Sequence, residues 1–94
     1  MVSKNIKSTC KIAAREAVSL SALSYEIPDI SIVIKKTDKN DILEIANIRN
    51  LMPVIGLLVE KDDALTIEVT SPDPNREELG IEVIEGWFKQ NAQA

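Results

Sequence analysis

The chain has 94 residues, 45% of them hydrophobic but only 3% aromatic, so its core must be built from Ile, Leu, Val and Ala. Its net charge of −4 argues against a nucleic-acid-binding protein, which normally presents a basic surface. No apolar run approaches the roughly 18 residues of a membrane span, and the first residues lack a stretch of signal-peptide length. We therefore expect a cytoplasmic protein, not bound to membranes, that folds as one domain over residues 1–94.

The sequence holds few of the residue types on which enzymes and metal sites depend. It has no histidine and one cysteine, Cys10, which excludes an intramolecular disulfide and argues against a structural zinc site. Asp38, Asn40 and Asp41 lie close together, but neither a glycine bend nor a distal glutamate accompanies them, so we interpret them as a solvated turn. The three glycines are too far apart for a phosphate-binding loop. We predict no catalytic residues, no metal and no cofactor.

The first two elements are predicted from a change of period along the chain. Residues 2–8 alternate weakly between apolar and polar side chains, as a half-buried strand does. From Ser8 or Thr9 onward the apolar residues recur at helical spacing, and either hydroxyl is a suitable N-cap. The helix must end by Ile27, because the residue before Pro28 is pushed out of the helical region. Its expected apolar stripe is Ala13, Ala17, Leu20 and Leu23.

A β-hairpin is predicted next. Residues 29–36 alternate and are rich in isoleucine, which favours a strand. Residues 37–41 are typical of a turn, and residues 42–46 form the returning strand, so the connecting loop is longer than the two-residue minimum.

The second half of the chain predicts a short helix, a strand and a long helix. Asn50 caps the short helix, which runs to about Leu58, and a strand follows around residues 64–69. Asp73 caps the last helix, with Pro74 in its first position, where a missing N–H does least harm. The expected buried residues are Leu51, Val54, Ile55 and Leu58 in the short helix, and Leu79, Val83, Ile84, Trp87 and Phe88 in the last.

The predicted order of elements is therefore βαββαβα. An α+β open-faced sandwich, with a four-stranded antiparallel sheet and all helices on one face, would bury both the strand alternation and the helical stripes. The alternative is a ferredoxin-like βαββαβ domain with an extra C-terminal helix, as in the small amino-acid-binding ACT modules. The middle helix favours the first arrangement because it is short for a ferredoxin-like crossover.

One segment resembles a known family. Residues 46–57, with the sequence ANIRNLMPVIGL, are followed by Lys61 and the strand residues 64–67. Together they resemble the regulatory-serine helix and following strand of HPr, the small phosphocarrier of the bacterial sugar phosphotransferase system. The resemblance extends without a gap from residue 46 to 88, and residues 11–14 (KIAA) stand where the family has Arg-Pro-Ala-Ala or Arg-Pro-Ala-Thr. It implies the HPr-like fold, with a hairpin that is several residues longer here.

The resemblance also implies where the family's phosphorylation sites would fall. The phospho-acceptor histidine falls on Thr9, the arginine that steadies its phosphate on Lys11, the helix-opening proline on Ile12, and the regulatory serine on Asn50. Because the chain has no histidine in any register, it cannot be a phosphohistidine carrier. A phosphothreonine at Thr9 would be a low-energy ester, unsuited to a relay. Asn50 cannot accept phosphate, although we expect its side chain to accept a backbone N–H as a cap.

Two candidate sites lie at the predicted start of the first helix. Thr9, Cys10 and Lys11 would form a weak anion site if free helix N–H groups point outward there; alternatively, Thr9 only caps the helix and Lys11 is solvated. The Cys10 thiol would be reactive if its pKa were lowered beside Lys11; alternatively, it is a small half-buried side chain with no special chemistry.

A third candidate is a protein-docking face. It consists of Leu51, Met52 and Ile55 of the middle helix with the adjacent Lys11 and Arg49. The resemblance implies a docking role, because the matching apolar residues of HPr contact enzyme I and sugar permeases. An apolar group with a polar rim suits protein recognition. The alternative is that these side chains are the buried stripe of a short helix, which would leave Met52 outside.

Three functional interpretations follow. The first is a non-catalytic HPr-like protein that binds another protein, either a phosphotransferase-system component or a regulator. The second is a ferredoxin-like, ACT-type module that binds a small ligand; the order of the strands distinguishes it from the first. The third is an enzyme that uses Cys10 as a nucleophile or cycles a phosphothreonine, which we rank last because the sequence places no base near Cys10.

Overall fold

The computed structural model describes residues 1–93, in which seven elements follow one another in the order βαββαβα. The strands are β1 (Val2–Lys7), β2 (Ser31–Thr37), β3 (Leu43–Asn47) and β4 (Ala64–Thr70), and the helices are α1 (Ala14–Glu26), α2 (Leu51–Gly56) and α3 (Pro74–Gln90). Among these described residues, none of the helices combines the length and apolar character that a membrane crossing needs.

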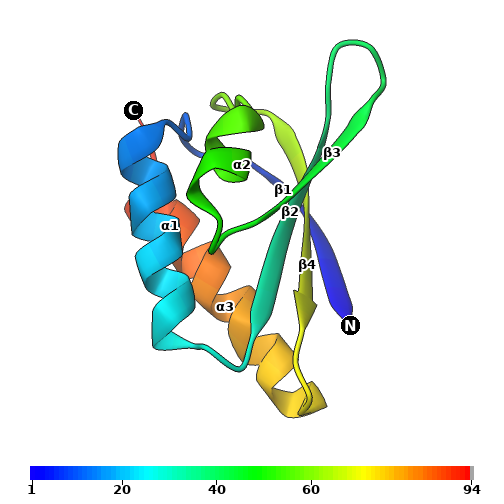
Figure 1. Ribbon diagram of the computed structural model, residues 1–94, viewed down its shortest axis with the longest axis vertical. Helices are drawn as coiled ribbons and strands as arrows, with labels where there is room; N and C mark the ends of the chain where they lie inside the picture. The colour runs from blue at the N-terminus through cyan, green and yellow to red at the C-terminus, as the bar shows by residue number, and fades with distance from the viewer. Residues whose placement is uncertain (94) are drawn as a thin grey trace.

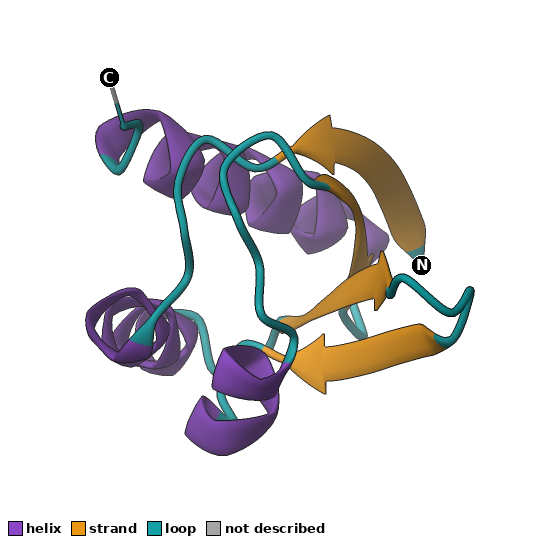
Figure 2. Ribbon diagram, turned by 90° about the horizontal axis from the view of Figure 1, so that it is seen from above, coloured by secondary structure: helices purple, strands orange, loops and turns teal. Residues whose placement is uncertain are grey.

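The four strands form one antiparallel sheet in the order β1-β4-β2-β3. All three helices lie on one side of the sheet and the other side is left open (Figure 1, Figure 2). This arrangement confirms the predicted open-faced α+β sandwich. In a ferredoxin-like sheet the third strand lies between the first two, whereas here the fourth strand does. The ferredoxin-like alternative is therefore wrong.

The core lies between the sheet and the helices and is mainly aliphatic, as the composition predicts. Alternate residues of the two central strands face the helices, and those buried there are Ile32, Ile34, Leu65, Ile67 and Val69. The two aromatic residues of α3 complete the core. Trp87 donates its indole N–H to Ser19 Oγ on α1 at 2.9 Å, and the Phe88 ring packs edge-on against it at a centroid distance of 5.0 Å.

The predicted start of the first helix at Ser8 or Thr9 is wrong, because α1 begins at Ala14. The two hydroxyls donate elsewhere: Ser8 Oγ to the carbonyl of Cys10, and Thr9 Oγ1 to the carbonyl of Phe88. The N-terminal end of α1 is stabilised by Glu16, whose carboxylate accepts the backbone N–H of Ala13 at 3.0 Å. The helix ends at Glu26, which confirms the prediction that it stops by Ile27.

The middle helix is shorter than predicted and buries a different residue near its end. It stops at Gly56, and Leu57 rather than Leu58 enters the core beside Val54. Leu58 adopts a left-handed conformation with φ 52°, which ends the helical path and turns its side chain into solvent. The expected inward position of Leu58 is therefore wrong.

The last helix begins as predicted. Asp73 Oδ1 accepts the backbone N–H of Asn75 at 3.0 Å, and Pro74 occupies the first position. Ile84, Trp87 and Phe88 are buried as expected, Val83 is half-buried, and Leu79 is exposed. The helix meets the sheet through Gly80 and Ile81 instead of Leu79, because Gly80 allows a close approach to β4.

Candidate functional site

The segment between β1 and α1, residues 8–13, is called here the 8–13 loop and contains three of the predicted site residues. Thr9 is half-buried in it, and its hydroxyl donates to the carbonyl of Phe88 at 2.5 Å. The carbonyl of Thr9 accepts the backbone N–H of Gln93 at 2.9 Å. Thr9 is therefore tied to the end of α3 and does not stand at the start of a helix.

Cys10 lies inside the core, with only 1% of its surface exposed. Burial raises the pKa of the Cys10 thiol by more than a hydrogen bond with Thr9 lowers it; the negative charge of Glu16 raises this pKa further, and Ser8 lowers it least. A buried thiol with a raised pKa is a poor nucleophile. The geometry thus favours the structural interpretation of Cys10 over the reactive one.

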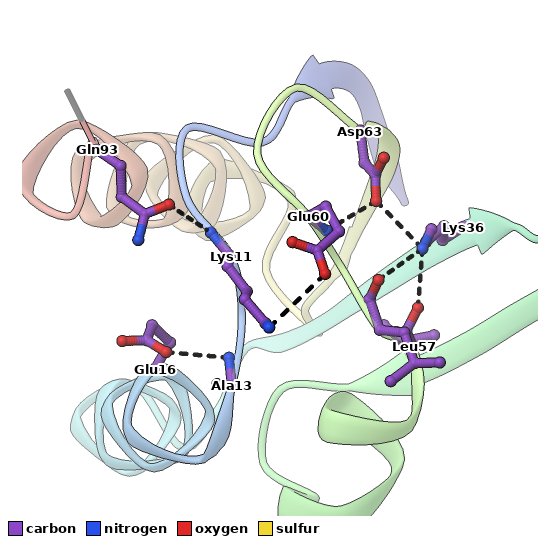
Figure 3. A network of polar contacts seen from close by, with 9 residues as sticks. Lys11, Ala13, Glu16, Lys36, Leu57, Glu60, Asp63 and Gln93 are labelled. Carbon is purple, nitrogen blue, oxygen red and sulfur yellow. Dashed lines mark hydrogen bonds and ion pairs between the residues drawn. The ribbon is translucent and has the colours of Figure 1, made fainter.

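Lys11 is exposed, but its polar groups already have partners (Figure 3). Its backbone N–H donates to Gln93 Oε1 at 3.1 Å, and its ammonium lies 3.8 Å from Glu60 Oε1. The anion site predicted at Thr9, Cys10 and Lys11 depended on free N–H groups at a helix start. Since α1 begins at Ala14 and the Lys11 N–H is bonded to Gln93, the free helix N–H groups on which this prediction depended are not present at these three residues.

Asn50 occupies the N-cap position of α2, but its side chain makes no capping hydrogen bond. Only its backbone carbonyl takes part, accepting the N–H of Val54 at 3.3 Å. The expected side-chain cap is therefore wrong, and Asn50 is exposed at the start of α2.

Three apolar residues of the predicted docking face lie on α2. Met52 is 70% exposed, Leu51 is partly exposed, and Ile55 is half-buried where it packs against the core. An exposed methionine offers a flexible, polarisable contact surface. The helix thus presents an apolar group to solvent while Val54 anchors it from the other side.

Arg49 joins the start of α2 to the end of α1. Its guanidinium donates to the carbonyl of Ser24 at 3.2 Å and lies 4.9 Å from the centre of the Tyr25 ring, a cation–π distance. The Ser21 hydroxyl donates to the carbonyl of Arg49 at 3.1 Å. These contacts hold α1 and α2 together at this end.

The five predicted docking residues lie on α2 and at its two ends. Leu51, Met52 and Ile55 are on the helix and Arg49 precedes it. Lys11 lies beyond its far end, next to Glu60, because the N–H of Ile12 bonds the carbonyl of Val59 at 3.0 Å. The structure thus places three of the five residues on α2 and one beyond each of its ends, and it does not gather them in a pocket.

Sequence reasoning missed three exposed apolar residues outside α2. Val18 and Tyr25 are exposed on α1, and Leu58 is exposed after α2. Val18 and Tyr25 are seven residues apart, which places them on one face of α1. Their position off the buried stripe of Ala17 and Leu20 was a signal that could have identified them.

A second polar network supports the end of α2 (Figure 3). The Lys36 ammonium donates to the carbonyls of Leu57 and Leu58 at 3.0 and 2.9 Å and lies 3.1 Å from Asp63 Oδ2. Burial alone would raise the pKa of Asp63, but hydrogen bonds from the Glu60 N–H and the Lys36 ammonium outweigh it and lower that pKa. Over residues 1–93, no group of three or more His, Cys, Asp or Glu side chains is arranged to hold a metal ion.

Comparison with known proteins gives a likeness in structure only. No family model matches the chain and no curated protein matches it. Among solved structures it is similar to HPr-C-His from Thermoanaerobacter tengcongensis, with a TM-score of 0.73. The two are 15% identical in sequence, and the match covers 97% of this chain and 94% of that chain. The fold is therefore HPr-like; identity this low shows the fold alone.

Proposed function

We propose that this chain is an HPr-like protein that does not carry phosphate and acts by binding another protein. One observation carries the proposal: a chain with an HPr-like fold over 97% of its length contains no histidine. The family that it resembles carries phosphate on an imidazole nitrogen. Without imidazole the fold keeps its surfaces but loses that chemistry, because function resides in sites and not in the fold.

The residues at the two altered phosphorylation positions do not replace the lost chemistry. The Thr9 hydroxyl already donates to the carbonyl of Phe88, and a phosphothreonine would not pass its phosphate on. The Asn50 amide is not a phosphate acceptor. The buried Cys10 thiol offers no alternative nucleophile.

The contact surface proposed for the partner is the docking face of Lys11, Arg49, Leu51, Met52 and Ile55. It combines an exposed apolar centre on α2 with a cationic residue at each end. An apolar centre bordered by charged groups suits recognition of a protein, because the centre provides desolvation and the border provides orientation. The resemblance to HPr favours a phosphotransferase-system component or a regulator as the partner.

The proposal is tested by titrating the isotopically labelled chain with enzyme I of the source organism, with and without phosphoenolpyruvate, while recording backbone amide NMR shifts. We expect shifts at residues 9–11 and 49–55 that do not change when phosphoenolpyruvate is added. The absence of any shift would remove enzyme I as a partner, and shifts confined to other segments would show that the docking face is misassigned.

A double variant tests the same face by binding affinity. Lys11→Glu combined with Met52→Ala should weaken binding by about tenfold or more, because it reverses one border charge and removes the most exposed apolar side chain. The matched control is Lys39→Glu with Leu79→Ala, which makes the same kinds of change at exposed positions on the hairpin and on α3. Equal affinity for both double variants would contradict the assignment.

A further inference from the structure

The strand β3 forms an edge of the sheet, and its outer backbone groups can be identified from the hydrogen bonds of the hairpin. Asp38 N–H bonds the carbonyl of Ile42, and Ile48 N–H bonds the carbonyl of Ile32. Because antiparallel strands alternate between bonded and non-bonded pairs, the even-numbered residues of β3 bond to β2. The N–H and C=O groups of Leu43 and Ile45 and the N–H of Asn47 therefore point away from the sheet, whereas the carbonyl of Asn47 accepts the N–H of Asn50 at 3.0 Å.

Three side chains beside this edge are exposed and apolar. Ile42 and Leu43 are exposed, and Ile45 is 55% exposed on the open face of the sheet. The opposite edge, β1, carries Lys4 and Lys7, and charges of this kind discourage strand pairing. Edge β3 has no lysine and no proline. It lies in a hairpin that projects beyond the body of the molecule (Figure 1), so a second strand can approach it.

We propose that a second copy of this chain pairs with β3 through the same strand, antiparallel and centred on Ile45. In this register Ile45 pairs with Ile45 of the other copy, and Leu43 pairs with Asn47 on either side of the two-fold axis. Ile45 and its copy then exchange two hydrogen bonds, and the carbonyl of each Leu43 accepts the N–H of Asn47 of the other copy, so the two sheets of four strands become one continuous sheet.

Charge disfavours the neighbouring register that is centred on Glu44. A pairing centred on Glu44 would place the two Glu44 carboxylates directly opposite each other, which is destabilising. Centring on Ile45 places Glu44 opposite Ala46 and brings two isoleucine side chains together. The strand is therefore complementary to itself, which is what an isologous two-fold interface requires.

The first test is the mass of the chain in solution, measured by sedimentation equilibrium over a range of concentrations. We expect the average mass to rise from 10.4 kDa towards twice that value as concentration increases. Ile45→Lys should raise the dissociation constant by about tenfold or more, because it places two ammonium groups directly opposite each other. Thr37→Lys, on the same open face but on β2, is the control and should dimerise like the wild type.

The second test fixes the register by disulfide trapping. Ile45→Cys places two thiols across a bonded pair, where the Cα atoms are about 5.5 Å apart, within the range of a disulfide. Leu43→Cys is the matched control, because Leu43 lies four residues from its own copy, about 13 Å along the strands. Under mild oxidation only Ile45→Cys should form a covalent dimer; the native Cys10 is buried and remains unreacted.

A chain that remains monomeric at every concentration overturns the proposal. So does a dimer that survives Ile45→Lys, or one that is trapped equally by both cysteine variants, because each would place the interface elsewhere. Lys11→Glu with Met52→Ala should leave the dimer unchanged. Failure of the proposed docking face, measured by partner binding, can thus be distinguished from failure of the β3 dimer, measured by mass in solution.

Discussion

Gly80 is a residue at which α3 lies close against β4. A Cβ atom placed there would lie 2.5 Å from Cγ1 of Val69 and 3.0 Å from Cγ2 of Ile30. Both neighbours are buried in the aliphatic core, where packing is too dense for either to move freely. The missing side chain at position 80 therefore sets the distance between α3 and β4.

Gly80→Ala should lower the free energy of unfolding by about 1–3 kcal/mol, because the added methyl overpacks the core by more than the helix gains in propensity. Urea denaturation followed by circular dichroism measures this change. Gly86→Ala is the matched control: it lies on the same helix with no atom within 4 Å of its added methyl, so it should be neutral or stabilising by up to about 1 kcal/mol. Equal stability of the two variants would contradict the close approach.

The role of Gly80 could not be predicted from the sequence, because the buried face of a helix is recognised from the spacing of its apolar side chains and glycine has no side chain. Thr9 shows a different limit of local reasoning. A hydroxyl before a helical pattern favours an N-cap, yet the same group can equally bond a distant carbonyl, and here it bonds Phe88. Which partner a hydroxyl takes depends on contacts that no local pattern contains.

At the scale of elements, α2 is too short to be stable alone and depends on its surroundings. The Lys36 ammonium from β2 donates to the carbonyls of Leu57 and Leu58, groups that the end of a helix leaves without partners. Asp63 holds that ammonium in place. The C-terminal end of α2 is thus fixed by a strand and a turn that are distant in sequence.

Asp63→Asn should make the free energy of unfolding less dependent on pH. The folded-state pKa of Asp63 is lowered, so its stabilising contribution is present above the unfolded pKa of about 3.9 and is lost as pH falls through the lower, folded-state value. The variant should be less stable than wild type by about 1 kcal/mol at pH 7, and this difference should shrink once the pH falls below the folded-state pKa of Asp63. Denaturation at several pH values measures this, with Asp62→Asn as the control. If the difference in stability between wild type and Asp63→Asn grew as the pH fell, the pKa of Asp63 would not be lowered by folding.

The elements themselves were predictable where a strong local signal marks them. The isoleucine alternation of β2, the stop before Pro28, and the Asp73–Pro74 start of α3 are all confirmed. The predicted boundaries failed at the start of α1 and the end of α2. At both places hydrogen bonds to distant residues, Phe88 in one case and Lys36 in the other, replace the local preference.

At the scale of the whole molecule, the fold and the site differ in how far the sequence predicts them. The order of elements and their periodicity predict the sheet and the layer of helices. The apolar residues of α2 were also identifiable, because Leu51, Met52 and Ile55 lie on one short helix. The contact of Gln93 with Lys11 could not be identified from the sequence, since 82 residues separate them. Only the folded chain brings its C-terminal end against the 8–13 loop.

That contact leads to the expectation that Thr9→His will not create a phosphocarrier. The side chain at position 9 lies against the end of α3, α1 begins only at Ala14, and the Lys11 N–H is bonded to Gln93. The new imidazole would therefore lack the free backbone N–H groups that stabilise a phosphate at a helix start. Enzyme I and radiolabelled phosphoenolpyruvate should leave the variant unlabelled while an HPr from the same organism is labelled, with circular dichroism confirming that the variant is folded. Stoichiometric phosphohistidine would instead mean that the 8–13 loop rearranges into a helix start, and that the histidine alone separates this chain from a carrier.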